Sequence, residues 1–215
     1  MKNVLKYFSL FVFVLLVLSC SSKKGIIRKG DKRYFDANNV EISKSSFENY
    51  RKKGGFLSVQ GDSVNHQKLV FRQEKGVIEN RDEIIQLLRA NVNQNFDRNK
   101  PIVIIFYPGK DPCNSSGASE KKWIRNWYIK LEEGVKQIAN TKPIYIYKNS
   151  EGLAKYKGII SWNKDPESII EKTFFKHHYP CSSFVVISEK GEYISYFGEF
   201  PKELVWKTLE ELKKQ

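Results

Sequence analysis

The sequence predicts an α/β protein in which a mixed β-sheet is flanked by helices and preceded by a small β-rich extension. Three observations carry this expectation. Ile102–Tyr107 is an uninterrupted apolar run, typical of a strand that is buried on both faces. From this run onward, the periodicity predicts the order strand, helix, strand, helix, strand, strand, helix. A strand–helix–strand start implies parallel neighbours with a right-handed crossover, and a closing hairpin is expected to add an antiparallel edge.

The N-terminal extension, residues 33–76, is expected to be small and rich in β-structure. Asn38 and Asn39 are typical of a hairpin turn, Ser43 is a helix-capping residue, and Gly54 and Gly55 end a helical stretch. The expected elements are a hairpin (33–36 and 40–43), a helix (43–53) and two strands (56–59 and 68–71).

The larger region, residues 77–215, shows clearer signals. Asn80 is expected to cap a helix, with Glu83 at its third position. Pro166 is expected to open another helix, and Gly191 closes a tight turn between two strands. After the first helix and strand Ile102–Tyr107, the expected elements are a loop (108–117), a helix (119–139), a strand (144–148), a helix (167–176), two strands (183–188 and 192–197) and a helix from Pro201.

Three of these helices carry an apolar stripe that is expected to face the core. An aromatic stripe at helical spacing is more often core than a ligand site, so the tryptophans of the second stripe are assigned to the core. The stripes are Ile84, Leu87, Leu88 and Val92 in the first helix; Trp123, Trp127, Leu131, Val135 and Ile138 in the second; and Leu204, Val205, Leu209 and Leu212 in the last.

Two loops of this region carry a more specific pattern. Residues 102–108, followed by a loop ending in Pro112 and Cys113, resemble the apolar strand, the Cys-x-Pro-Cys loop and the long helix of thioredoxins. Residues 179–185, followed by Gly191 and Gly198, resemble the cis-proline loop and closing hairpin of the same family. The resemblance implies that residues 77–215 form a thioredoxin-like domain.

The two loops also depart from the family pattern. Lys110 stands where the family places its attacking cysteine, and Cys113 stands where it places the resolving one. Ser182 occupies the position expected for the cis-proline, and Pro180 is displaced. Because thiol–disulfide exchange needs one thiolate to attack and a second to resolve, this degenerate loop is not expected to perform ordinary thioredoxin chemistry.

The N-terminus has the features of an export signal. Lys2 and Lys6 precede an apolar stretch, residues 7–18, which is shorter than the roughly 20 residues that span a bilayer. Val17, Leu18, Ser19 and Cys20 then resemble the lipobox of bacterial lipoproteins. The resemblance implies cleavage of residues 1–19, acylation of Cys20, and a cell-envelope protein held to a membrane by lipid. An ordinary secretory signal with an incidental cysteine is the alternative.

The chain is strongly basic, with a formal net charge of +13. Its positive charges next to Cys20, in the tether formed by residues 20–32, are expected to attract anionic lipid headgroups. A solvated, soluble tether explains them equally well. Without an RNA-binding or helix-turn-helix signature, no nucleic-acid partner is expected. The basic residues nearest the anchor are Lys23, Lys24, Arg28, Lys29, Lys32 and Arg33.

Once Cys20 is lipidated, Cys113 and Cys181 are the remaining cysteines. In a thioredoxin fold their two loops lie side by side, so the resemblance implies that they are close. Four interpretations remain open. They form a structural disulfide, worth about 4 kcal/mol on the chain-entropy model; they form a redox pair in which Cys113 attacks and Cys181 resolves; they bind copper or zinc together with His177 and His178; or both thiols are free and buried. No cofactor is predicted and no metal site is assigned.

These observations predict a membrane-anchored, non-catalytic binding or accessory module that is stabilised by a Cys113–Cys181 disulfide and has a possible protein partner. The alternative is an atypical thiol–disulfide oxidoreductase that uses the same two cysteines. Other enzyme classes find no support, because the histidines accompany no nucleophile elbow and the glycines form no phosphate-binding fingerprint.

Overall fold

The computed structural model describes residues 30–92, 96–115 and 120–214, and the segment Lys32–Gln215 forms one compact unit. The expected signal sequence and Cys20 lie outside the described residues. In the described part of the chain, no helix is long and apolar enough to cross a membrane.

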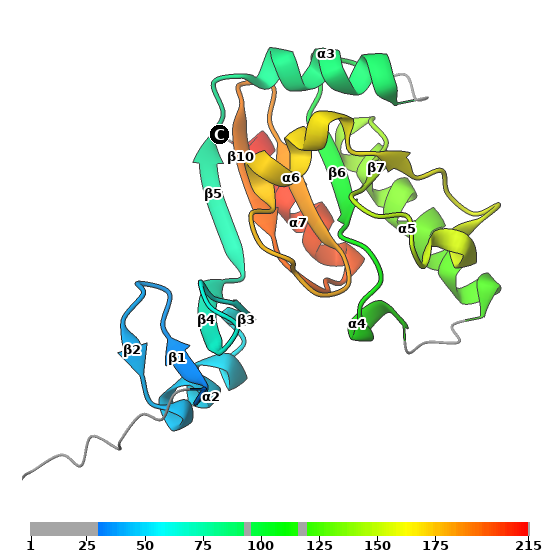
Figure 1. The fold of residues 1–215 in the computed structure, drawn as a ribbon. Helices are drawn as coiled ribbons and strands as arrows, with labels where there is room; N and C mark the ends of the chain where they lie inside the picture. Colours follow the sequence, from blue (N-terminus) through cyan, green and yellow to red (C-terminus); the bar gives the residue numbers. More distant parts are fainter. Residues whose placement is uncertain (1–29, 93–95, 116–119, 215) are drawn as a thin grey trace, which may run out of the picture. The chain divides into compact units, whose positions relative to one another are not determined.

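The main sheet is mixed and has six strands (Figure 1). The central strand β6 runs parallel to β7 and antiparallel to β9, and β9 and β10 form an antiparallel hairpin. This confirms the α/β class, the parallel start of the sheet and the closing antiparallel hairpin. The hairpin does not form the expected edge of the sheet, because β5 pairs with β10. In sheet order, the strands are β5 (Gln73–Val77), β10 (Glu192–Tyr196), β9 (Ser183–Ile187), β6 (Ile102–Tyr107), β7 (Ile144–Tyr147) and β8 (Asn163–Lys164).

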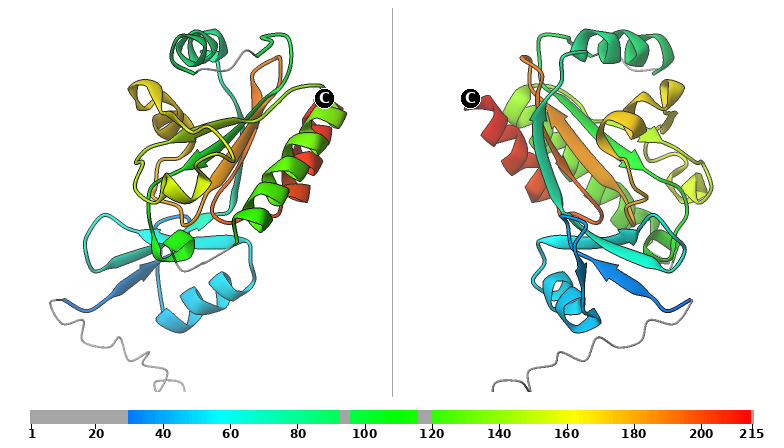
Figure 2. Two further views of the ribbon diagram at one scale, coloured as in Figure 1. Left: turned by 90° about the vertical axis from the view of Figure 1, so that its right-hand side faces the viewer. Right: turned by 60° about the vertical axis from the view of Figure 1, so that its left-hand side comes forward.

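Helices cover both faces of the main sheet (Figure 2). Alternate residues of β6 therefore enter two different cores: Val103 and Ile105 pack with α5 (Lys121–Ala139) and α7 (Lys202–Lys213). Ile102, Ile104 and Phe106 pack with α3 (Arg81–Asn91) and α6 (Ile169–Phe174). All six residues of β6 are buried, which explains its uninterrupted apolar sequence.

A second, N-terminal sheet is built from the extension. Its strand order is β2 (Glu41–Ile42), β1 (Arg33–Phe35), β4 (His66–Phe71) and β3 (Phe56–Gln60), with β1 parallel to β4 and the other pairs antiparallel. Helix α2 (Lys44–Lys52) begins after Ser43, whose hydroxyl accepts a hydrogen bond from the Ser46 amide at 3.1 Å. The expected hairpin, helix and strand pair of the extension are all present.

Arg72 lies where the chain passes from the N-terminal sheet into the main sheet. Its amide donates to the carbonyl of Gly55, which precedes β3 of the N-terminal sheet, and its own carbonyl accepts from the Phe197 amide beyond β10. The next strand, β5, pairs antiparallel with β10 and was not anticipated from the sequence. Its polar residues show no strand pattern in the sequence. Backbone hydrogen bonds to β10 are what place it at the edge of the sheet.

Two expected helices and one expected loop differ in detail. The helix opened by Pro166 is a short 3-10 turn, η2 (Pro166–Ser168), followed by α6, whose first amides donate to the Asp165 carboxylate. The expected loop after β6 contains a four-residue helix, α4 (Pro112–Ser115). Asn80 stands at the N-cap of α3 but makes no side-chain capping bond; its amide group donates to Glu83 at 3.2 Å.

The stripe expected on α5 is wrong at its first position, whereas Trp127 and Ile138 are partly buried and pack against the core. Trp123 is 61% exposed and Trp127 is half-buried, whereas Ile124 and Tyr128 are buried with Leu131 and Val135. Each four-residue step along a helix turns by about 400°, so a stripe built from such steps drifts by about 40° per step. Counting back from Leu131, Trp127 lies at the border of the buried face and Trp123 lies beyond it.

Candidate functional site

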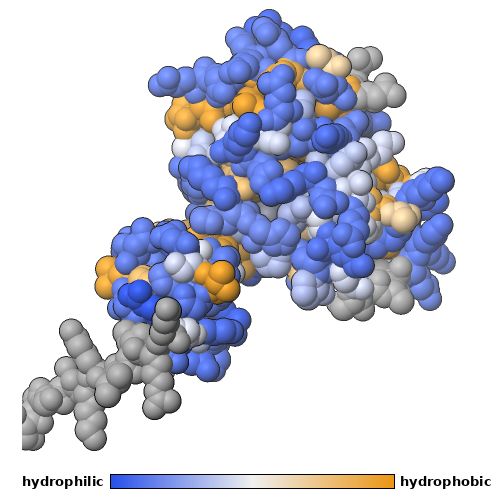
Figure 3. All heavy atoms as spheres, in the orientation of Figure 1, coloured by the Kyte–Doolittle hydropathy of each residue, from blue (hydrophilic) through white to orange (hydrophobic). Residues whose placement is uncertain are grey.

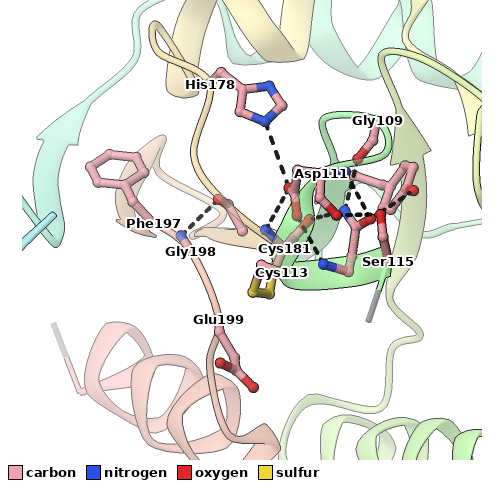
Figure 4. The surroundings of a disulfide bond; sticks show 12 residues. Gly109, Asp111, Cys113, Ser115, His178, Cys181, Phe197, Gly198 and Glu199 are labelled. Atoms are coloured by element: carbon pink, nitrogen blue, oxygen red, sulfur yellow. Dashed lines mark hydrogen bonds and ion pairs between the residues drawn. A yellow bond between two sulfur atoms is a disulfide. The ribbon is translucent and has the colours of Figure 1, made fainter. Parts of the chain in front are cut away.

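The candidate site lies where the ends of β6 and β9 meet. Phe106 of β6 pairs with Ser183 of β9, so the loop after β6 and the loop before β9 are neighbours. Cys113 in α4 and Cys181 in the second loop form a disulfide, with their Cα atoms 5.2 Å apart across a sequence separation of 68 residues (Figure 4). The bond confirms the expected pairing, and the interpretation with two free thiols is wrong.

The disulfide is accessible to solvent. Cys113 is exposed and Cys181 is half-buried. Cys181 also has a backbone φ of 67°, a conformation that side chains other than glycine rarely adopt. The bond preceding Pro180 is trans, and none of the described peptide bonds is cis, so the expected cis-proline loop is not formed.

The buried carboxylate of Asp111 holds the two loops together. One oxygen accepts a hydrogen bond from the Cys181 amide at 2.8 Å, and the other accepts from the Asn114 amide at 2.8 Å. His178 Nε2 lies 3.6 Å from the first oxygen, and Figure 4 shows its ring directed toward Asp111. The backbones that carry both cysteines are thus fixed by bonds other than the disulfide.

Asn114 adds a second set of links beside Cys113. Its side-chain oxygen accepts from the Asp111 amide at 3.0 Å, and its amide group donates to the Gly109 carbonyl at 2.8 Å. The Lys155 ammonium donates to the Asn114 carbonyl at 2.6 Å, and burial lowers the pKa of this lysine. A cation is therefore held within the site by a neutral partner.

The phenol of Tyr107, the last residue of β6, lies beside Asn114 of the site. It donates to the Glu151 carbonyl at 2.8 Å, and burial raises its pKa to about 12. A phenol with this pKa stays protonated at neutral pH, so it acts here as a hydrogen-bond donor and not as a base.

The other residues singled out in the sequence lie apart from the disulfide. Lys110, at the position of the family's attacking cysteine, is exposed and lies 3.4 Å from Glu151. His177 packs edge-on against Tyr179, with 5.8 Å between ring centroids. Neither His177 nor His178 joins the two cysteines in a cluster of ligand atoms among the described residues, so the proposed copper or zinc site with these histidines is not formed.

Glu199 is a site residue that the sequence analysis missed. One of its carboxylate oxygens and the sulfur atoms of Cys113 and Cys181 all lie within 4.8 Å of one another. Figure 4 shows the sulfur atoms on the side of the loops that faces Glu199. An antiparallel hairpin returns the end of β10 to the start of β9, so the predicted topology could have indicated that the residues after β10 lie beside Cys181.

A pocket of about 240 Å³ opens beside the disulfide. Aromatic side chains, among them the exposed Trp123, form part of its lining, together with two charged side chains, Lys155 and Glu199. The aromatic lining residues are Trp123, Trp127, Tyr128, Tyr156 and Phe200. By contrast, the molecular face drawn in Figure 3 is mostly hydrophilic, with hydrophobic side chains in small groups.

Comparison with known proteins adds no family assignment. No protein-family model matches the sequence, and no curated protein shows significant similarity to it. The geometry of the site therefore carries the functional argument.

Proposed function

We propose that this chain is a lipid-anchored cell-envelope protein whose thioredoxin-like domain binds a segment of a partner protein in the pocket beside the Cys113–Cys181 disulfide. The pocket, with the exposed Trp123 in its lining, is the observation that carries the proposal. Attachment through Cys20 rests on the export signal and lipobox of the sequence.

The size of the pocket favours a protein segment over a free small molecule. Drug-sized ligands occupy sites of roughly 300–1,000 Å³, and this pocket of about 240 Å³ suits one large apolar side chain. Exposed tryptophans are enriched among the residues that dominate binding energy at protein interfaces. The charged groups of Lys155 and Glu199 provide polar contacts around an apolar centre, the usual anatomy of such interfaces.

A peptide selection tests the binding role. The full chain carrying Cys20→Ser, kept in detergent, is used to select ligands from a displayed peptide library, and affinities are then measured by fluorescence anisotropy. We expect peptides with a large apolar residue, and we expect Trp123→Ala to weaken them at least tenfold. Ile129→Ala is the matched control, because Ile129 is exposed on the same helix but does not line the pocket. A selection without enrichment, or equal effects of both substitutions, contradicts the proposal.

Membrane attachment needs its own measurement. We expect the wild-type chain to sediment with membranes and Cys20→Ser to move to the soluble fraction or to remain uncleaved. Mass spectrometry of the N-terminal peptide identifies the acyl groups. An unmodified Cys20 in the mature protein contradicts the anchor.

Thiol–disulfide exchange is the second candidate function, and the exposure of Cys113 favours it. In this reaction Cys113 attacks and Cys181 resolves. The reduction potential of the pair separates the two roles: a value below about −300 mV indicates a structural bond, and a higher value indicates a labile one. Under the catalytic role, Cys113→Ser abolishes insulin or glutathione turnover; under the structural role, it lowers stability by up to about 4 kcal/mol.

A further inference from the structure

Three potential ligand atoms from three different segments converge at the disulfide. Cys113 belongs to α4, Cys181 to the loop before β9, and Glu199 to the loop between β10 and α7. Their two sulfur atoms and one carboxylate oxygen lie within 4.8 Å of one another, and this is the group of possible metal ligands found among the described residues. We propose that reduction of the Cys113–Cys181 disulfide converts these three side chains into a binding site for Zn²⁺.

The distances suit a zinc ion after a small adjustment. Zn–S bonds are about 2.3 Å and Zn–O bonds about 2.0–2.2 Å, which places the ligand atoms of a tetrahedral site roughly 3.5–3.8 Å apart. Opening the disulfide lets the sulfur atoms separate toward that spacing, and the carboxylate is already within 4.8 Å of both. Three protein ligands leave the fourth tetrahedral position for water or a partner's ligand.

The backbone around the ligands is held without help from the disulfide. The Asp111 carboxylate binds the Cys181 amide, and it also binds the Asn114 amide next to Cys113. On the third segment, the Arg72 guanidinium donates to the Glu199 carbonyl at 2.8 Å. The reduced protein therefore keeps its ligands near their positions, which lowers the entropy cost of metal binding.

The preceding residue also fixes the third segment. The Gly198 amide donates to the Ser183 hydroxyl at 3.1 Å, and Gly198 has a φ of 75°, which other residues rarely adopt. Glu199 thus follows a turn that is tied to the first residue of β9, two positions after Cys181.

The charges of the site balance. Two thiolates and one carboxylate around Zn²⁺ carry a net charge of −1. The Lys155 ammonium, which lines the same pocket, offsets this negative charge. Two thiolates in the ligand set are typical of zinc sites, whereas magnesium and calcium select oxygen ligands.

The reaction has two steps. A dithiol reductant transfers two electrons and two protons to the disulfide, so that Cys113 and Cys181 become thiols while the reductant becomes a disulfide. Zn²⁺ then binds the two thiolates and the Glu199 carboxylate, and the two thiol protons pass to solvent. This site extends beyond the partner-binding role proposed above and does not depend on it.

The test uses the full chain with Cys20→Ser, so that Cys113 and Cys181 supply the only thiols. The protein is reduced with dithiothreitol, freed of it, and titrated with Zn²⁺ against a chromophoric chelator. We expect one Zn²⁺ per reduced chain and none per oxidised chain. Co²⁺ in place of Zn²⁺ should give a thiolate-to-metal charge-transfer band, which reports sulfur coordination directly.

Glu199→Gln is the decisive variant, because it leaves both cysteines and the disulfide in place. We expect it to weaken Zn²⁺ binding at least tenfold, whereas Glu203→Gln, an exposed control that faces Lys202 at 2.7 Å, leaves affinity unchanged. Equal affinity of wild type and Glu199→Gln overturns the site. So does a reduced chain that binds no Zn²⁺, or a disulfide that dithiothreitol does not open in the folded protein.

Discussion

The main sheet and the N-terminal sheet differ in how their faces are covered. Helices lie on both faces of the main sheet, and every residue of β6 and β9 is buried. Within residues 32–71, which form the N-terminal sheet and α2, only Phe47, Val59 and Leu69 are buried. Three buried side chains cannot stabilise an independent domain, so the N-terminal sheet depends on the rest of the unit.

The contacts between the two sheets support this dependence. Val59 of β3 belongs to the same core cluster as Ile104 and Phe175 of the larger region. Arg72 binds the carbonyls of Phe197 and Glu199 and lies over the Tyr196 ring. The comparison indicates that the main sheet supplies most of the free energy of folding, whereas the N-terminal sheet stays folded only while its contacts with the main sheet are intact.

The largest expected difference comes from matched phenylalanine truncations. Phe184 in β9 and Phe47 in α2 are both buried. Phe184→Ala should lower the free energy of global unfolding by about 3–5 kcal/mol, measured by urea denaturation. Phe47→Ala should instead reduce hydrogen-exchange protection mainly in residues 32–71. If Phe47→Ala lowers protection throughout the main sheet equally, the two sheets unfold as one cooperative unit and the distinction fails.

Two glycine-to-alanine substitutions, one in each region, should change stability by smaller amounts and in opposite directions. A Cβ at Gly134 of α5 overlaps the indole of Trp206, whose ring nitrogen donates to the Leu131 carbonyl. Overpacking costs about 1–3 kcal/mol and exceeds the roughly 1 kcal/mol gained in helix propensity, so Gly134→Ala should lower the melting temperature. Gly55 before β3 has open space, and Gly55→Ala should be neutral or stabilise by up to about 1 kcal/mol. Destabilisation by both variants contradicts the contrast in packing.

Sequence patterns correctly predicted the elements whose own residue types show that they are buried. The apolar run of β6 and the hairpin of β9 and β10 are examples. Strand β5 escaped prediction because backbone pairing with β10 holds a polar segment at the sheet edge. The stripe of α5 was extended wrongly to Trp123, because four-residue steps drift around a helix.

Only part of the candidate site was predicted from the sequence. The closeness of the two cysteines was implied by the resemblance to thioredoxins, and the pairing of β6 with β9 brings their loops together. The role of Asp111 depends on a hydrogen bond to the amide of Cys181, 70 residues away, and Glu199 approaches the sulfur atoms only through the return of the hairpin. Residue types identify candidates, but contacts between distant backbone segments decide which of them share a site.

The smallest expected effect is a pH dependence at the contact between the two regions. Burial lowers the pKa of His177, and the positive charges of Lys68 in β4 and Lys176 lower it further, while Asp62 opposes them. The unfolded chain, with a histidine pKa of about 6.5, then binds a proton more readily than the folded chain. Stability is therefore greatest above this pH and falls as the pH drops toward the lowered pKa of the folded state.

Variants at this contact isolate the effect. Urea denaturation at about pH 7 and about pH 5 should show a smaller loss of stability on acidification for His177→Gln than for wild type. Lys68→Met removes one of the repelling charges from the N-terminal sheet, so it should reduce the loss partway and raise the His177 pKa in an NMR titration. Because Lys68 belongs to β4, a wild-type pKa for His177 in Lys68→Met means that the N-terminal sheet does not dock beside His177 in solution.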